Sequence, residues 1–142
     1  MKLTITNWSE INKALKVHAE KVLDEVAEKL FQLGLATIND ARTHARFNNF
    51  SNNLRSSFAI AVALNGKIIK SDYSQVGNGT LGDGSEGMAK AKKLINEIVS
   101  EHRNQLLLVL VAGESYALYV EAKDNKTVLT QFALELKKKL TR

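Results

Sequence analysis

Hydrophobic positions recur at helical spacing over residues 8–47, which predicts one long N-terminal helix. Asn7 followed by Glu10 predicts an N-cap with its capping-box partner, and we expect a kink or a break at Gly34. Forty residues at about 1.5 Å each span roughly 60 Å, whereas a compact domain of this chain length is only about 35–40 Å across. The helix is therefore expected either to bend near Gly34 or to project and pack its apolar stripe against a partner. The stripe comprises Ile11, Leu15, Ala19, Val22, Val26, Leu30, Leu33, Ile38, Ala41 and Ala45.

A strictly alternating pattern over residues 58–64 predicts a β-strand, and the Asn-Gly pair that follows predicts a type I′ turn into a second strand. In the register of such a turn, Ile69 lies opposite Val62 and Tyr73 lies opposite Phe58. The even-numbered positions of the first strand are bulky and the odd-numbered ones are alanines. We therefore expect one bulky apolar face and one smooth face that a helix can approach closely.

The rest of the chain predicts a small α+β fold. Residues 74–87 hold five glycines and no proline, which predicts a mobile loop. Apolar positions then predict a helix at 88–103, a buried strand at Leu106–Ala112 and a last amphipathic helix at 128–140. The hairpin and the later strand are expected to form a small antiparallel or mixed sheet. We expect residues 1–142 to form a single domain.

The composition, with 44% hydrophobic and 25% charged residues among 142, is ordinary for a soluble globular protein. The chain has no cysteine, which excludes a disulfide framework and any cysteine-based metal site. The N-terminus has no apolar segment typical of a signal peptide, and the longest apolar run, Leu106–Ala112, is too short to cross a membrane.

The net charge of +5 arises mainly in residues 89–142, which carry +4 and end in Leu-Lys-Lys-Lys-Leu-Thr-Arg. Two interpretations of this basic segment remain open. One is contact with phosphate or with an acidic partner. The other is a solvated helix end whose lysines complement the helix dipole.

Candidate chemistry is sparse. Residues 77–82 match the G-x-G-x-x-G pattern, but five more residues separate them from the predicted helix, and no second parallel strand supplies a ribose-binding acid. The histidines, His18, His44 and His102, lack the spacing of metal ligands. No serine has the neighbouring base and strained elbow of a nucleophile.

Glu114 and Glu121 are either a carboxylate pair or, as we favour, two surface acids that flank a tyrosine patch. Because no catalytic set is apparent, we expect no enzymatic activity, no cofactor and no metal.

Three stretches carry a family likeness. Residues 41–62 combine Ala-Arg-Thr-His-Ala-Arg, a polar break and Asn-Leu-Arg-Ser-Ser before a strand. Residues 85–98 resemble the mid-chain helix of the same family. Residues 107–130 contain Val-Ala-Gly-Glu-Ser-Tyr-Ala-Leu-Tyr-Val-Glu. In order and spacing the chain resembles the minor tail, or tail-completion (neck), family of long-tailed bacteriophages and prophages. Two departures affect turns: Ser-Asn at 51–52 replaces the usual Thr-Gly, and Lys-Asp-Asn-Lys at 123–126 replaces the usual glycine.

The resemblance implies a non-enzymatic structural protein that joins head and tail, or completes the tail, as part of an oligomeric ring. The implied partners are further copies, other neck or tail proteins and, non-specifically, passing DNA, with no membrane. The implied location is the virion, after synthesis in the host cytoplasm. The alternative function is a basic nucleic-acid-binding module, whose affinity would fall steeply with salt. The predicted subunit interface comprises Arg42, Arg46, Arg55, Tyr116, Tyr119 and Glu121.

Alternatives remain open at two of these places. Arg42 and Arg46 share one helical face at a spacing of four, and form either an anion or acidic-partner clamp or an exposed basic helix end. Tyr116 and Tyr119, accompanied by small alanines, form either a subunit contact or a cap over the core of their own domain.

Overall fold

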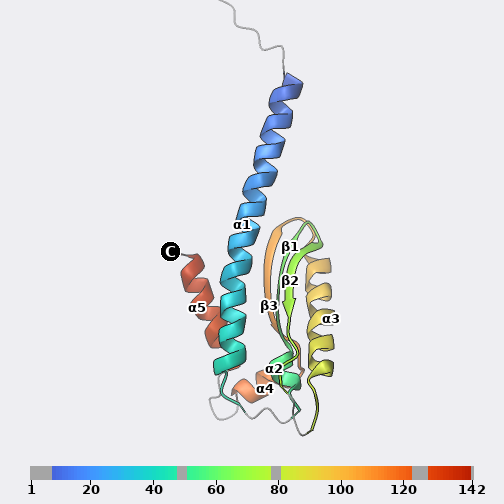
Figure 1. The fold of residues 1–142 in the computed structure, drawn as a ribbon, viewed down its shortest axis with the longest axis vertical. Helices are drawn as coiled ribbons and strands as arrows, with labels where there is room; N and C mark the ends of the chain where they lie inside the picture. The colour runs from blue at the N-terminus through green and yellow to red at the C-terminus, as the bar shows by residue number, and fades with distance from the viewer. Residues whose placement is uncertain (1–7, 48–50, 78–80, 123–127, 142) are drawn as a thin grey trace, which may run out of the picture.

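The computed structural model describes residues 8–47, 51–77, 81–122 and 128–141 (Figure 1). Its long N-terminal helix, antiparallel sheet and shorter helices confirm the predicted α+β class. Within the described ranges, no helix has both the length and the apolar content needed to cross a membrane. The elements in chain order are α1 (Trp8–His44), α2 (Asn53–Ser56), β1 (Phe58–Leu64), β2 (Lys67–Tyr73), α3 (Ser85–Glu101), β3 (Leu106–Ala112), α4 (Ala117–Ala122) and α5 (Thr130–Leu140).

The strands form one antiparallel sheet in the order β2-β1-β3. The central strand β1 pairs along its whole length with β3 and is buried except at its last residue. In the turn between β1 and β2, φ is 51° at Asn65 and 81° at Gly66. This confirms the predicted turn, because a type I′ turn needs positive φ at both central residues.

The predicted register of the hairpin is wrong beyond the turn. Val62 pairs with Lys70 rather than with Ile69, and Tyr73 pairs with Ala59 rather than with Phe58. The cause is a β-bulge, which inserts one extra residue into β2 and shifts all later pairs by one.

The bulge also changes which side of the sheet the β2 side chains face. Ile68, before the bulge, packs on the α3 side of the sheet. Lys70, after it, lies over the ring of Phe31 on α1, and Asp72 contacts Arg42 of α1. In a regular strand these three side chains would share one face, so the bulge allows β2 to serve both helices.

The helices α1 and α3 cover opposite faces of the sheet (Figure 1). Phe58 and Ile60 of β1 share a core with Ile38 of α1 and Phe132 of α5. The alanines of β1 instead share a second core with α3, whose buried positions include Ile95. The predicted division of β1 into a bulky face and an alanine face is therefore confirmed.

The helix α1 runs without interruption to His44, three residues short of the predicted end at 47, and continues through Gly34. A Cβ atom at Gly34 would lie 2.0 Å from Cδ1 of Ile60. The glycine therefore permits close contact between α1 and β1 rather than a break in the helix. The N-terminal half of α1 projects beyond the sheet (Figure 1), as the second alternative expects, whereas packing of its apolar stripe against a partner stays a prediction. Asn7, the expected N-cap, lies outside the described residues.

Two short helices, α2 and α4, were not predicted, because four and six residues are too few to show a helical period. Of the predicted helices, α3 begins three residues earlier than expected, at Ser85, and α5 begins two residues later, at Thr130.

The described parts of the glycine-rich segment at 74–87 lie against α2. Gly84 has φ of 81°, and a Cβ atom there would lie 2.1 Å from Oγ of Ser56. The Ser56 hydroxyl in turn accepts a hydrogen bond from the backbone N–H of Val76 at 2.8 Å. Glycine at 84 is therefore required by conformation and by close approach. Residues 78–80, on which the prediction of a mobile loop also falls, lie outside the described residues.

Candidate interaction surfaces

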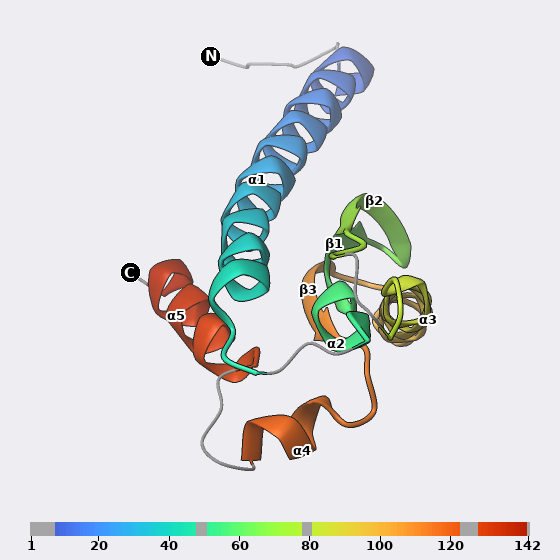
Figure 2. The same ribbon diagram turned by 60° about the horizontal axis from the view of Figure 1, so that its bottom comes forward.

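The N-terminal half of α1 stands clear of the rest of the molecule in two views (Figure 1 and Figure 2). Every residue from 12 to 26 is exposed, and the apolar ones are no exception. Leu15 is 62% exposed and Val22 is 43% exposed. Leucine and valine are among the residues most often fully buried, so this half of α1 presents a row of hydrophobic side chains that its own fold leaves uncovered.

The apolar positions of α1, which the sequence groups as one stripe, divide between two faces. The face that rests on the sheet alternates steps of four and three residues, and comprises Ala27, Phe31, Gly34, Ile38, Ala41 and Ala45. The other face, hereafter the α1 stripe, follows an 11-residue repeat, and comprises Ile11, Leu15, Ala19, Val22, Val26, Leu30 and Leu33. At about 100° per residue, the two faces point about 110° apart. Sequence reasoning missed this division, although the two spacings were there to show it.

The helix α5 covers the continuation of the α1 stripe toward the C-terminal end of α1. Thr37, which follows Val26 by one 11-residue step, lines a hollow together with Asp40 and with Phe132, Glu135 and Lys139 of α5. The stripe is thus covered where α5 lies and open from Leu33 to its N-terminal end. The packing of α5 shows that an amphipathic helix fits this side of α1.

Arg42, one of the predicted interface residues, is only 8% exposed. Its Nη1 donates to Oδ2 of Asp72 at 2.5 Å and to Oδ1 of Asn39 at 3.0 Å, and its Nη2 donates to the carbonyl of Phe58 at 2.7 Å. Arg46 lies beyond the end of α1 and is exposed. The shared helical face predicted for the two arginines is therefore wrong, and Arg42 is not part of an exposed helix end. It joins α1 to the sheet.

Arg55 of α2 also makes contacts within the chain. Its guanidinium donates to the carbonyl oxygens of Arg42 and Ala45, at the C-terminal end of α1, and lies 4.9 Å from the ring centre of Phe47. Burial lowers the pKa of Arg55 from its ordinary value. A cation at this end of a helix complements the helix dipole, so Arg55 acts as a cap supplied by the neighbouring helix.

Glu121 of α4 caps the N-terminal end of α5. Its Oε1 accepts hydrogen bonds from the backbone N–H groups of Val128, Leu129 and Thr130, and its Oε2 accepts one from the Thr130 hydroxyl at 2.5 Å. Burial acts to raise the pKa of Glu121, but the hydrogen bonds from Thr130 and the two preceding N–H groups outweigh it, so that the pKa lies below its ordinary value. The carboxylate therefore satisfies N–H groups that a helix start leaves without partners.

The remaining predicted interface residues, Tyr116 and Tyr119, lie at the surface around α4. Ala117 faces inward and belongs to the main core, whereas Tyr119 is 63% exposed. Burial and the nearby charge of Glu114 raise the pKa of Tyr116. Because Tyr119 is mostly exposed, it does not close the core of its own domain. The two tyrosines, hereafter the tyrosine patch, lie in α4 and immediately before it, and α4 is at the end of the molecule opposite the projecting part of α1 (Figure 1).

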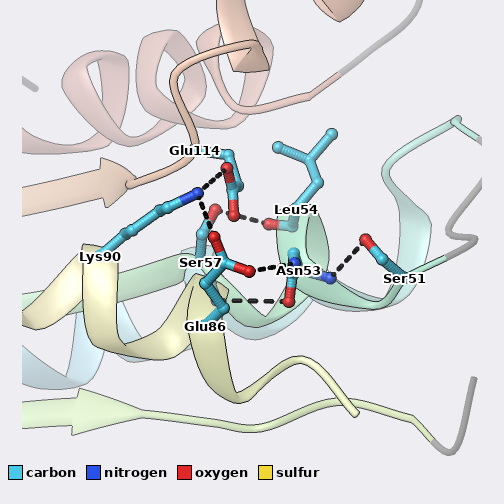
Figure 3. A network of polar contacts seen from close by, with 8 residues as sticks. Ser51, Asn53, Leu54, Ser57, Glu86, Lys90 and Glu114 are labelled. Carbon is cyan, nitrogen blue, oxygen red and sulfur yellow. Dashed lines mark hydrogen bonds and ion pairs between the residues drawn. The ribbon is translucent and has the colours of Figure 1, made fainter. Parts of the chain in front are cut away.

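A polar network beside α2 holds this end of the molecule together (Figure 3). Lys90 of α3 donates to Glu86 and to Glu114, at 2.9 Å in each case. The side chain of Asn53 approaches Glu86 at 3.5 Å, and its Oδ1 accepts from the N–H of Gly87 at 3.4 Å. Hydrogen bonds and charges from Glu86 and Glu114 raise the pKa of Lys90, and Lys90 lowers the pKa of Glu86. The network joins α2, α3 and the segment after β3.

The same network corrects the interpretation of the two glutamates. The side chain of Glu114 is only 1% exposed, so it is not the surface acid that the sequence suggested. Its ion pair is with Lys90, whereas Glu121 binds the start of α5. The two carboxylates therefore serve separate structural contacts.

The basic segment at the C-terminal end lies where the helix-dipole interpretation expects it, and contact of this segment with phosphate or an acidic partner stays a prediction. Lys137, Lys138 and Lys139 occupy the last turn of α5 and are exposed, where cations are stabilising. Among the described residues, no group of three or more His, Asp or Glu side chains is arranged to hold a metal. No family model, curated protein or solved structure matches the chain.

Proposed function

We propose that this chain is a non-enzymatic structural protein of a phage or prophage particle, which joins head and tail or completes the tail as part of an oligomeric ring. The resemblance of residues 41–62, 85–98 and 107–130 to the phage neck and tail-completion family supports the proposal. The observation that carries the proposal is the projecting half of α1, with its uncovered α1 stripe. In a particle, such a helix would bury its exposed apolar side chains against neighbouring protein chains.

The energetic reason lies in the isolation of that segment. Residues 12–26 are all exposed, so this part of α1 lacks the packing against its own chain that supplies most of the stability of helices in proteins. A row of exposed hydrophobic side chains also marks a site of protein–protein contact. Both properties are expected of an assembly protein, because it covers such surfaces by binding its neighbours.

Ring formation requires two different surfaces that fit one another, since a head-to-tail contact is heterologous. The tyrosine patch is the second surface that the proposal uses. Tyrosine is enriched in interface cores because it offers large contact area with few rotatable bonds. Arg42, Arg55 and Glu121, by contrast, hold the fold in place and do not take part in the ring contact.

The proposal is tested on particles from the strain that encodes the chain. Immunogold labelling is expected at the head–tail junction or the tail end, and a Tyr119→Ala variant is expected to fold and yet be depleted from particles. Leu134→Ala is the matched control, because Leu134 is also a large, exposed hydrophobic residue but lies on α5. The proposal fails if particles lack the protein while the free chain binds DNA with strong salt dependence, the result expected of the nucleic-acid-binding alternative.

A further inference from the structure

We infer that the α1 stripe binds the α1 stripe of a second copy, with the two helices antiparallel. The inference names the partner of a surface on which the proposed function rests, but its test uses the purified protein and does not involve particles. Three observations support it: the spacing of the stripe, the distribution of charge along α1 and the position of α5.

The spacing of the α1 stripe is the same in both directions. From Ile11 to Leu30 the steps are four, four, three, four and four residues. A second α1 that runs in the opposite direction therefore presents matching rows when its residue i lies level with residue 41 − i. Leu15 then lies level with Val26 of the other copy, and Ala19, which is small enough for close approach, lies level with Val22.

The charges beside the stripe favour the antiparallel orientation. Lys16 and Glu25 each lie about 90° from the centre of the stripe, whereas Lys13, Asp24 and Glu28 point about 150–170° away from it, and Glu28 pairs with Lys70 of its own chain. The antiparallel register places Lys16 level with Glu25 of the other copy, because 16 and 25 sum to 41. A parallel pair in register would place each of the two level with its own like charge. Such complementarity favours one arrangement over another even where each exposed charge pair is weak.

The position of α5 limits where the second helix lies. α5 packs on the stripe side of α1 beside Thr37, which is buried, so a further helix on this side has room only from Leu33 toward the N-terminus. The antiparallel register uses residues 11–30 of each copy and so stays within that open part. The two folded bodies then lie at opposite ends of the helix pair, about 30 Å of which is shared.

The contact is two-fold and closes on itself, since each stripe meets its own counterpart. The free protein is therefore a dimer of twice 15.7 kDa. The tyrosine patch lies beside α4, at the other end of each body (Figure 1). The dimer is therefore a state of the free protein, and in the ring of the proposed function the α1 stripe would exchange this partner for the tyrosine patch of a neighbouring copy.

The first experiment measures mass by sedimentation equilibrium over a wide range of protein concentration. The unaltered chain is expected to be a concentration-dependent dimer, and Val22→Asp is expected to weaken dimerisation on the order of 100-fold, because it places a charge in an apolar contact. Val17→Asp is the matched control. Val17 is exposed and apolar on the same segment, but points about 180° away from the stripe, so its substitution should leave the dimer intact.

The second experiment determines orientation, and the absence of native cysteine makes it direct. Leu15→Cys and Val26→Cys variants are mixed and oxidised, and the mixed disulfide between the two variants is expected to dominate. A monomer at every concentration, or equal loss of the dimer in Val17→Asp and Val22→Asp, would overturn the inference. Preferential linkage of Leu15→Cys to itself would overturn the antiparallel arrangement. None of these results would bear on labelling of particles, so failure here is distinguishable from failure of the proposed function.

Discussion

Arg42 of α1 and Asp72 of β2 form an ion pair at 2.5 Å, which joins the long helix to the edge strand of the sheet. The pair exists because the bulge in β2 places Asp72 on the α1 side. Arg42 also donates to the carbonyl of Phe58, so one guanidinium binds both β1 and β2.

Arg42→Met is therefore expected to lower the free energy of unfolding by about 3 kcal/mol, because it removes one partner of a largely buried pair while keeping most of the side-chain volume. Urea unfolding followed by circular dichroism measures the change. Arg46→Met is the control, with an expected change within about 0.5 kcal/mol because Arg46 is exposed. Equal effects of the two substitutions would contradict the structural role of Arg42.

Gly34→Ala is expected to destabilise the protein by about 1–3 kcal/mol, although alanine is the better helix former. The added Cβ would lie 2.0 Å from Cδ1 of Ile60. Ile60→Val removes that methyl group and by itself should cost about 1 kcal/mol. The double variant should be more stable than the sum of the single effects predicts, which a double-mutant cycle measures. Strict additivity would show that the close approach of α1 and β1 is not the reason for the glycine.

Glu121→Gln is expected to cost about 1 kcal/mol at neutral pH, as is typical for the loss of a helix cap. The pKa of Glu121 is lower in the folded protein than its ordinary value of 4.5. Its stabilising effect is therefore fully present above pH 4.5 and is lost as the pH falls through the lower, folded-state pKa.

The difference in unfolding free energy between the original protein and Glu121→Gln should accordingly shrink as the pH is lowered from neutral toward 3. Urea titrations at a series of pH values measure this difference, and other acidic groups cancel because both proteins contain them. A difference that stays constant from neutral to acid pH would be inconsistent with a charged cap.

Lys90→Ala is expected to lower the free energy of unfolding, because it leaves the buried carboxylate of Glu114 without its cation. The loss of stability should be smaller than for a fully buried ion pair, because the Lys90 side chain is 41% exposed. Adding Glu114→Gln should restore at least half of the loss, since the uncompensated charge is then absent. Lys93→Ala, an exposed neighbour on α3, should change the stability little. No recovery in the double variant would argue against an ionic role for Glu114.

The features that could be predicted from the sequence are those set by local pattern. Alternation over residues 58–64 and the Asn-Gly turn define a hairpin without help from distant residues, and both were found. The bulge at Ile69 was not predictable from local pattern, because the contacts that accompany it, those of Lys70 and Asp72 with α1, join residues far apart in the chain. Periodicity also gave the helices α3 and α5, whereas α2 and α4 are too short to show a period.

The candidate interface was predicted only in part, for a related reason. Tyr119 is exposed because the opposite side of α4, which carries Ala117, packs on the core. Which side of α4 packs on the core is decided by tertiary contacts and not by local sequence. Arg55 and Glu121 looked like surface charges because their partners, helix ends, cannot be seen in a list of residue types. The sequence did show that α1 is longer than its domain, and this length argument led to the projecting helix.

A small change in the tilt of α1 at the contact between Gly34 and Ile60 causes a large displacement at the N-terminal end of the helix. Ile11 lies about 35 Å from Gly34 along the helix, so a tilt of about 10° at the contact displaces Ile11 by about 6 Å. The size of the Ile60 side chain beneath the helix therefore affects the position of the N-terminal end of α1. Variation at this buried position would change the spacing between joined copies without altering any residue of the surfaces that join them.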